Sequence, residues 1–464
     1  MNSRSQIGVG IVGSGMIAQF HATALQQIEG VRLVGIYSST EGKRQSFADK
    51  WSCRAFATLQ ELLSEVDMIL IATPSGTHLD ITLDAAKHGV HVLCEKPLEI
   101  TTSRIDQMIE AAEENQIILG GIFNRRFNSA VSRLKEAVVQ NRFGQLTICD
   151  AQIKWYRTQE YYDSGGWRGT WTLDGGGALM NQSIHTIDLL IYLAGPIKRL
   201  AAITKTLTHD RIEVEDNAVI MVEYESGAIG TIQASTSCWS EDGHAAEVNI
   251  CGTAGSVFMH DDRFAKWEFK EAKPEDARIR TELMRTDAVA EGANDPKAIQ
   301  VDGHIRNIQN FVSAVRRTDA LGIDGLEARK AVAVIEAIYE SARNDGKWVS
   351  LSQNDGASAE IQTWSPIDLA SLQKIVHEGV EKMSQEQKAL WEVMKISPTK
   401  WEEPEFGQEH GFWVVGKSKD KVIWYNDIEE GFNISTFTKS NIIDEYGAEQ
   451  DELHWTIGKI LYRH

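Results

Sequence analysis

The sequence is poor in cysteine, and none of its cysteines forms a C-x-x-C pair. The five residues are scattered along the chain: Cys53, Cys94, Cys149, Cys238 and Cys251. Disulfide frameworks and cysteine zinc sites both need paired spacings. We therefore expect a cytoplasmic protein from a reducing compartment, with no disulfide framework and no metal site.

Positive charge and long apolar runs are scarce as well. The formal net charge is −19 at pH 7, so we expect neither nucleic acid nor a membrane surface as a partner. No uncharged apolar run is long enough to cross a bilayer. Residues 1–5 lead directly into an apolar segment, so we expect no signal peptide. The length of 464 residues predicts two or three domains.

A glycine turn near the start organises the first part of the chain. The apolar run 7–12 ends in Gly13-Ser14-Gly15-Met16-Ile17-Ala18 and passes into a helix-like segment. A strand, a glycine turn and a helix bring a dinucleotide pyrophosphate against free backbone N–H groups. Gly13 permits the tight turn, and Gly15 has no Cβ to hold the phosphate away. The pattern alone is equally compatible with an ordinary turn after a buried strand.

The next hundred residues favour the dinucleotide site. Apolar runs at 31–37, 68–73, 90–94 and 117–122 alternate with amphipathic segments such as 81–88 and 104–115. This alternation predicts a parallel sheet with helices on both faces. Ligands of such sheets lie at the carboxyl ends of the strands. Polar residues directly after each run are therefore candidates for the site.

The end of the second run bears on the choice of cofactor. Ser38 and Ser39 stand where NAD-binding domains usually have an acidic residue for the ribose, and Lys43 and Arg44 follow. Hydroxyls and cations suit a 2′-phosphate, so the sequence favours NADP slightly over NAD. The two cations could equally belong to the solvated face of a helix.

Lys96 follows the run 90–94 in the segment Glu95-Lys96-Pro97. A lysine that emerges from a buried strand lies at the ligand-binding edge of the sheet, and Pro97 fixes the backbone there. A lone lysine is usually a surface charge, but this position favours a functional one.

These segments resemble the Gfo/Idh/MocA family of NAD(P)-dependent sugar and cyclitol oxidoreductases. The resemblance rests on GSGMIA (13–18), ATPSGTH (72–78), CEKPL (94–98) and NRRF (124–127), in that order. It implies that Lys96 contacts both the nicotinamide ribose and the substrate hydroxyl. It also implies cofactor contacts for the following residues: Gly13, Gly15, Met16, Ile17, Ser38, Ser39, Thr73, Pro74, His78, Glu95 and Asn124.

A second informative block runs from 165 to 188. Three glycines at 175–177 lead into an expected helix that continues to Ala194, before Gly195-Pro196. Asn181, His185 and Asp188 share one polar stripe of this apolar helix, which requires hydrogen-bonding partners or a wet cleft. A capped helix with His185 bonded to Asp188 or a backbone carbonyl is the alternative. We find no third ligand at metal-binding spacing.

The block matches the substrate-side motif of the family, which implies an acid/base role for His185. Many members have Asp where this chain has Asn181, and a neutral amide cannot take up a proton. We therefore expect Asn181 to orient the substrate and Asp188 to fix His185. Trp167 and Arg168 are expected to line the substrate site, whereas the other nearby aromatic residues suit core packing: Trp155, Tyr156, Tyr161 and Tyr162.

The chemistry of Lys96 and His185 suits alcohol oxidation. Histidine titrates near neutrality and can take the hydroxyl proton, and a lysine ammonium stabilises developing alkoxide charge. The sequence thus predicts an NAD(P)-dependent oxidoreductase acting on a hydroxyl or carbonyl carbon of a sugar, cyclitol or sugar derivative. The alternative is a non-catalytic dinucleotide-binding sensor that acts through its C-terminal part.

We expect three domains. Residues 1–124 form a Rossmann dinucleotide-binding domain, and 125–352 form an α/β domain with a mainly antiparallel sheet (219–224, 229–234, 246–251 and 256–259). The resemblance implies a homodimer or homotetramer through this domain. Residues 270–300 are predicted to be a loop that could act as a lid over the site.

Residues 362–464 are expected to form a small α+β module. A helix around Leu369–Val376, a capping box at Ser384-x-x-Gln387 and a hairpin at 412–425 are predicted in it. We expect this module to bind a partner, to mediate oligomerisation or to gate the substrate. Asp427, Glu429 and Glu430 could chelate a cation, although exposed carboxylates near a turn are favoured.

Overall fold

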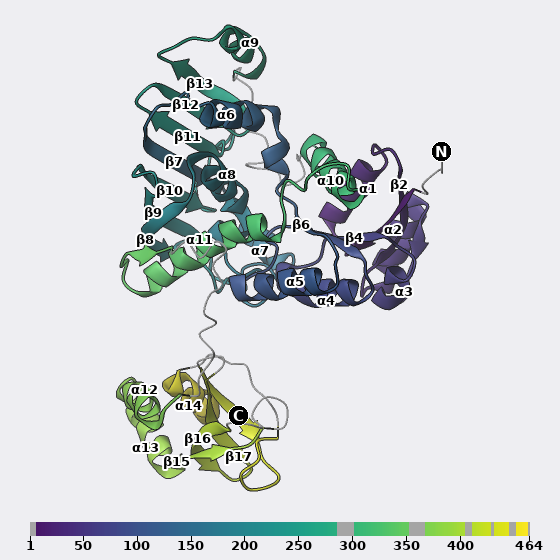
Figure 1. Cartoon of the computed structure of the whole chain (residues 1–464). Helices are drawn as coiled ribbons and strands as arrows, with labels where there is room; N and C mark the ends of the chain where they lie inside the picture. The colour runs from purple at the N-terminus through teal and green to yellow at the C-terminus, as the bar shows by residue number, and fades with distance from the viewer. Residues whose placement is uncertain are drawn as a thin grey trace. The chain divides into compact units, whose positions relative to one another are not determined.

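The computed structural model of this chain describes residues 6–284, 301–351, 367–403, 411–427, 431–444 and 452–462. The chain divides into two compact units, Met1–Gln353 and Asn354–His464 (Figure 1). In the described parts of the chain, no helix is long and apolar enough to span a membrane.

The first unit begins with a six-stranded parallel sheet in the order β3-β2-β1-β4-β5-β6. The strands are β1 (Ile7–Val12), β2 (Val31–Tyr37), β3 (Arg54–Ala55), β4 (Met68–Ile71), β5 (His91–Cys94) and β6 (Leu119–Gly121). The helices are α1 (Met16–Leu25), α2 (Glu41–Trp51), α3 (Leu59–Leu63), the short η1 (Ser75–Thr77), α4 (His78–Lys87) and α5 (Thr102–Glu114). All pairings are parallel, so the predicted Rossmann fold is confirmed.

Helices cover both faces of this sheet, which explains why its central strands are apolar throughout. One face packs against α3, α4 and α5, and the other against α1, α2 and a later helix, α10 (Asp302–Val315) (Figure 1). Ile308, Phe311 and Val312 of α10 lie in the same core as β1. The first domain therefore includes a segment far beyond residue 124, the boundary expected from the sequence.

The second domain contains an eight-stranded sheet in the order β13-β12-β11-β7-β10-β9-β8-β14. Its strands are β7 (Leu146–Lys154), β8 (Ile197–Lys205), β9 (Asn217–Tyr224), β10 (Ile229–Ser235), β11 (Glu247–Gly252), β12 (Gly255–His260), β13 (Arg263–Phe269) and β14 (Val349–Ser350). The pairings between these strands are antiparallel except for the parallel pair β7–β10. The mainly antiparallel sheet is thus confirmed.

Helices pack on one face of this second sheet. They include α6 (Ser129–Val139), α8 (Ile184–Ala194) and α11 (Gly325–Arg343), while η2 (Asn124–Phe127), α7 (Gln159–Asp163) and a π-helix, η3 (Ala178–Ser183), lie near the domain junction. The other face carries apolar side chains that are 47–62% exposed: Ile148, Ile203, Val219, Met221 and Ile229. The sheet therefore has one buried and one open face.

The loop predicted at 270–300 is wrong for its first part. Residues Pro274–Leu283 form a helix, α9. Asp276 accepts a hydrogen bond from the Lys273 backbone N–H at 2.7 Å and a bidentate pair from Arg142 at 2.7 and 2.8 Å. These bonds fix the N-terminal turn of α9 to the rest of the domain. Residues 285–300 lie outside the described residues.

The second unit is an α+β module with a four-stranded antiparallel sheet. Its elements are α12 (Leu369–Glu381), α13 (Gln385–Met394), β15 (Lys395–Trp401), β16 (Phe412–Ser418), β17 (Lys421–Asn426), β18 (Gly431–Thr436) and α14 (Leu453–Tyr462), with sheet order β15-β16-β17-β18. The helices pack on one face of the sheet, and a second apolar core lies on the other. The predicted capping box at Ser384 and Gln387 and the predicted hairpin are confirmed.

The acidic group predicted in this module is only partly described. The Asp427 Oδ2 atom accepts a hydrogen bond from the Ile367 backbone N–H at 2.8 Å. Glu429 and Glu430 lie outside the described residues. Within the described ranges, no group of three or more metal-ligating side chains is found.

Candidate active site

A cavity of about 860 Å³ lies at the carboxyl ends of β1, β2, β4 and β5 and extends to η3 and α8 of the second domain. The predicted residues that line it are Gly13, Gly15, Met16, Ile17, Ser38, Ser39, Thr73, Pro74, Glu95, Lys96, Asn124, Trp167, Arg168, Asn181 and His185. His78 and Asp188 are predicted residues that do not line it. The cavity thus joins the expected cofactor edge to the expected substrate side.

The glycine turn has the geometry that a dinucleotide pyrophosphate requires. Gly13 has a φ of +110°, and a Cβ at this residue would lie 2.3 Å from the Ala72 carbonyl oxygen. A Cβ at Gly15 would meet no atom within 4 Å, because the backbone borders open space there. Gly15 is also the N-cap of α1, and no side chain caps this helix. The first N–H groups of α1 are therefore available to a phosphate, and the turn fits the dinucleotide.

The two cationic residues that follow β2, Lys43 and Arg44, lie in different surroundings. Lys43 lines the cavity together with Ser38, Ser39 and Thr40. The Arg44 guanidinium instead donates a hydrogen bond to the Ser38 carbonyl oxygen at 3.1 Å and does not line the cavity. Of the two, Lys43 is the one placed to meet a ligand.

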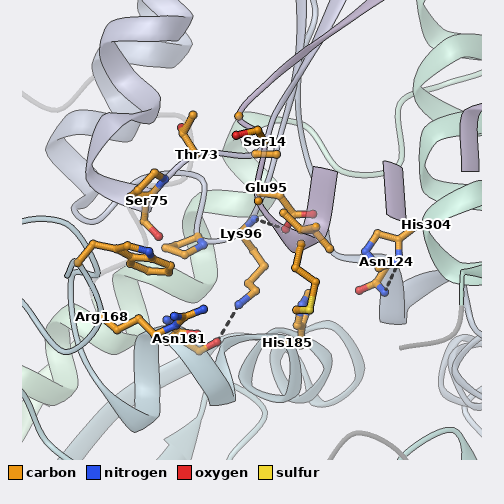
Figure 2. Close-up of a pocket in the computed structure, with 18 of the residues that line it drawn as sticks. Ser14, Thr73, Ser75, Glu95, Lys96, Asn124, Arg168, Asn181, His185 and His304 are labelled. Carbon is orange, nitrogen blue, oxygen red and sulfur yellow. Dashed lines mark hydrogen bonds between the residues drawn. The ribbon is translucent and has the colours of Figure 1, made fainter. Parts of the chain in front are cut away.

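Lys96 extends from the end of β5 across the cavity toward the second domain (Figure 2). Its Nζ atom donates a hydrogen bond to the Asn181 carbonyl oxygen at 2.8 Å. Burial lowers the pKa of Lys96 below its ordinary range, while the negative charges of Glu95 and Asp174 oppose this shift. Those two carboxylates therefore favour the ammonium form.

His185 borders the same cavity, on the opposite side of Lys96 from Asn181 (Figure 2). Burial, followed by the charges of Lys96 and Arg125, lowers the pKa of His185 well below 6.5. Its Nδ1 atom is buried and has no hydrogen-bond partner among the described residues. The imidazole is therefore neutral at pH 7 and able to accept a proton.

Asp188 does not fix His185, so that prediction is wrong. Its carboxylate accepts two hydrogen bonds from Arg126 of η2, at 2.6 and 2.8 Å, and both side chains are almost fully buried. Arg126 also bonds Glu327 of α11 at 2.9 Å. These contacts turn Asp188 away from the cavity and hold α8, which carries His185, against η2 and α11.

His78 is buried beneath the cavity, and the structure does not support the predicted direct contact with the cofactor. Its Nδ1 atom lies 3.1 Å from the Pro97 carbonyl oxygen and 3.2 Å from that of Leu98. Its Nε2 atom lies 3.1 Å from the Thr73 carbonyl oxygen. The imidazole therefore ties together the loops that follow β4 and β5.

Asp174 is a residue of the site that the sequence analysis missed. It accepts hydrogen bonds from the Asn181 Nδ2 atom at 2.5 Å and from the Gly169 backbone N–H at 2.9 Å. Burial raises the pKa of Asp174 to about 6. A carboxylate thus lies one contact farther from the cavity than Asn181. The sequence feature that could have revealed Asp174 is its position directly before the glycine run 175–177.

The sequence analysis also missed a group of interacting side chains behind the expected cofactor-binding edge of the first sheet. The His21 Nε2 atom lies 2.9 Å from a Glu95 carboxylate oxygen, and the other oxygen accepts a hydrogen bond from the Lys96 backbone N–H at 3.1 Å. His304 of α10 packs edge-to-face on His21 and lies 3.2 Å from the Asn124 amide. Sequence spacing could not reveal this group, because α10 is distant in the chain.

Known proteins match this chain over both domains of its first unit. Residues 7–122 match the family model described as oxidoreductase family, NAD-binding Rossmann fold, and residues 131–258 match the GFO/IDH/MocA C-terminal domain. The crystal structure of the WlbA dehydrogenase from Bordetella pertussis, in complex with NADH and UDP-GlcNAcA, is 31% identical. The match has a TM-score of 0.69 and covers 76% of this chain and 99% of that chain. This chain belongs to the Gfo/Idh/MocA family.

Several relatives of this chain are named dehydrogenases. Myo-inositol 2-dehydrogenase from Thermotoga maritima is 27% identical over 257 residues, which cover 54% of this chain and 74% of the relative. The scyllo-inositol 2-dehydrogenase (NAD(+)) from Bacillus subtilis is 28% identical over 269 residues, with 55% and 74% coverage. This chain is accordingly an NAD-binding oxidoreductase that acts on CH–OH groups.

The buried Arg126–Asp188 pair should be essential to stability. We expect Arg126→Met to lower the free energy of unfolding by about 3–5 kcal/mol, because Asp188 is left as a buried charge without its cation. Urea unfolding would measure the change. Arg133→Met, which breaks an exposed pair with Glu136 on α6, should cost less than about 1 kcal/mol. Equal losses in the two variants would contradict the role of Arg126.

Proposed function

We propose that this protein oxidises a ring hydroxyl of a sugar, a cyclitol or a sugar derivative, with Lys96 and His185 as its catalytic pair. The observation that carries the proposal is that both side chains border one cavity with the dinucleotide-binding turn (Figure 2). The names of the relatives support a polyol substrate, and they include both myo-inositol and glucose 6-phosphate. The family therefore leaves the charge of the substrate open.

His185 and Lys96 divide the proton chemistry between them. His185 is neutral and accepts the proton of the substrate hydroxyl, while the Lys96 ammonium stabilises the developing negative charge on that oxygen. The nicotinamide, when bound, accepts the hydride. In the reverse direction His185 returns the proton and Lys96 polarises the carbonyl.

Asn181 and Asp174 position this pair. The Asn181 carbonyl oxygen holds the Lys96 Nζ atom, and its side-chain amide is held by Asp174. The negative charge of Asp174 also favours the charged form of Lys96. A non-catalytic sensor would not need this arrangement of base, cation and compensating carboxylate, so the enzyme is favoured.

For the cofactor, we propose that the site accepts NADP as well as NAD. Lys43 and three hydroxyl residues border the cavity after β2, where the ribose 2′ position of a dinucleotide is bound in this fold. A lysine there can bind a 2′-phosphate as a point charge.

For the assembly, we propose a homodimer or homotetramer formed through the open face of the second sheet. Ile203, Val219 and Met221 are adjacent across β8 and β9, and Ile148 and Ile229 extend the apolar surface onto β7 and β10. A contiguous apolar patch of this kind on a sheet face is typical of a subunit interface.

The catalytic pair can be tested with Lys96→Met and His185→Gln. We expect each variant to reduce kcat/KM by at least about 100-fold, because it removes an acid/base or charge-stabilising group. Absorbance of the reduced nicotinamide would measure turnover, and its fluorescence would measure dinucleotide binding, which should change little in His185→Gln. Because the pKa of Lys96 is lowered, the rate should fall at alkaline pH before an ordinary lysine would titrate. Lys198→Met on β8 is the control, and turnover that survives in both variants would refute the assignment.

The cofactor proposal can be tested with Lys43→Ala. We expect this change to weaken NADPH binding by roughly tenfold, since a charge-assisted contact is lost, and to leave NADH binding nearly unchanged. Fluorescence titration would give both dissociation constants. Lys50→Ala, on α2 but outside the cavity, should alter neither. If wild-type protein binds no NADPH, the proposal is wrong.

The proposed interface can be tested with Met221→Lys. A charge in the centre of the apolar face should dissociate the assembly, because the ammonium would have to be buried without a partner. Analytical ultracentrifugation would measure the mass. Val139→Lys, an equally drastic change at an exposed position of α6, should leave the assembly intact. A monomeric wild-type protein would rule out the proposal.

A further inference from the structure

One wall of the cavity alternates guanidinium groups with aromatic rings. The Arg125 guanidinium lies 5.8 Å from the centre of the Trp155 ring, and Arg157 lies 5.3 Å from the same ring. Arg157 and Arg168 lie 5.6 and 4.7 Å from the Tyr161 ring. We call Arg125, Trp155, Arg157, Tyr161 and Arg168 the guanidinium wall. All five residues line the cavity.

The guanidinium wall is connected to Lys96 through Gln182 and Asn181. Arg157 donates a hydrogen bond to the Gln182 side-chain oxygen at 2.9 Å, and the Gln182 amide donates to the Asn181 Oδ1 atom at 2.9 Å. Asn181 in turn holds Lys96. Figure 2 shows Arg168 close to Asn181, on the opposite side of Lys96 from His185. A group bound on the wall would therefore lie next to the reacting carbon.

Unused donors remain on this wall. In the described ranges, no carboxylate lies within ion-pair distance of Arg125 or Arg168. The Trp155 Nε1 and Arg168 Nε atoms are buried, and within the same ranges neither has a hydrogen-bond partner. Trp155 is only 7% exposed, so water reaches it poorly. Buried donors of this kind normally have a partner, which a ligand in the cavity can supply.

The charges on the wall favour an anion. Three guanidinium groups and the Lys96 ammonium share one cavity, where their mutual repulsion is poorly screened. The carboxylates that line the cavity lie on other elements: Glu95 on the loop after β5, Asp261 and Asp262 on the β12–β13 turn and Asp302 on α10. Glu95 is already paired with His21. Guanidinium groups bind carboxylate and phosphoryl oxygens in forked pairs, and the rings between them suit the face of a sugar.

We propose that the sugar oxidised by this enzyme carries a carboxylate or a phosphoryl group, and that the guanidinium wall binds it. The inference rests on the proposed function and deepens it, because it names the charge class of the substrate. Tyr161 borders the sugar ring, and the anion places the reacting hydroxyl between Lys96 and His185.

Matched pairs of sugars test the proposal on the full-length protein. Glucuronate and glucose 6-phosphate are each compared with glucose, and UDP-glucuronate is compared with UDP-glucose. Binding to the enzyme–NADH complex is measured by nicotinamide fluorescence, and turnover is measured with NAD and NADP. We expect at least one anionic sugar to bind roughly tenfold or more tighter than its neutral parent, as a charge-assisted pair predicts. A preference for glucuronate identifies a carboxylate, and equal binding of both UDP-sugars, tighter than glucose, identifies the phosphoryl groups.

Variants of Arg168 show whether the wall causes this preference. Arg168→Gln should raise KM for the anionic sugar by roughly tenfold with kcat little changed, and should barely affect the neutral parent. Arg168→Lys keeps the charge and should restore part of the preference. Arg211→Gln, which removes an exposed guanidinium paired with Asp163, should change neither substrate.

The outcomes separate this inference from the proposed function. Neutral parents that bind as well as the anionic sugars, no binding by any sugar, or equal losses for both in Arg168→Gln would overturn the inference. Preferential turnover of neutral sugars would overturn it while supporting the dehydrogenase. Anionic sugars that bind preferentially, with no oxidation of any sugar, would support the guanidinium wall and overturn the proposed reaction.

Discussion

The site depends on one hydrogen bond that joins two domains, from the Lys96 ammonium to the Asn181 carbonyl oxygen. Lys96 comes from the end of a parallel strand, and Asn181 comes from a π-helix at the edge of the second sheet. A π-helix widens the helical turn and is frequent at functional sites. Here it allows a backbone carbonyl to face the cavity. The dinucleotide-binding turn and His185 then border one space.

Buried charges hold the surroundings of this bond in place. Arg126 fixes Asp188 and thereby α8, and His21 fixes Glu95 directly before Lys96. At the start of η3, Glu215 accepts hydrogen bonds from the backbone N–H groups of Gly177 and Leu179, at 3.1 and 2.8 Å. Burial raises the pKa of Glu215 to about 7. Each of these ionisable groups thus has a bonding partner in the segment that it positions. Buried charges need such partners.

The sequence predicted the elements whose pattern depends on local burial. The strands of the first sheet are apolar throughout because helices cover both faces, and each of β1, β2, β4, β5 and β6 coincided with an apolar run. Strands β7, β8 and β13 of the second sheet were missed, because charged residues interrupt their apolar patterns. Helix α10 belongs to the first domain through tertiary packing, which no local pattern reports.

The presence of Lys96 and His185 at one cavity was predictable from motifs, but the partners of polar residues were not. The spacing of His185 and Asp188 permitted a hydrogen bond between them, yet an arginine 62 positions away in sequence bonds Asp188 instead. The partners of His78 were not predictable either, because they are carbonyl oxygens of two other loops. Helical spacing shows which residues can share a face of a helix. The choice of partner depends on the charge that the fold brings to that face.

The cations of the guanidinium wall also affect the base. Arg125 contributes to the low pKa of His185, and Arg125 and Arg157 both lower the pKa of Lys96. An anionic group bound on the wall would offset these charges, because opposite charges at short range stabilise the protonated forms. The affinity of His185 for the substrate proton would then increase when the substrate binds. In the proposed reaction, substrate binding and proton transfer would be coupled through Arg125, so that the base is strongest when the hydroxyl is in place.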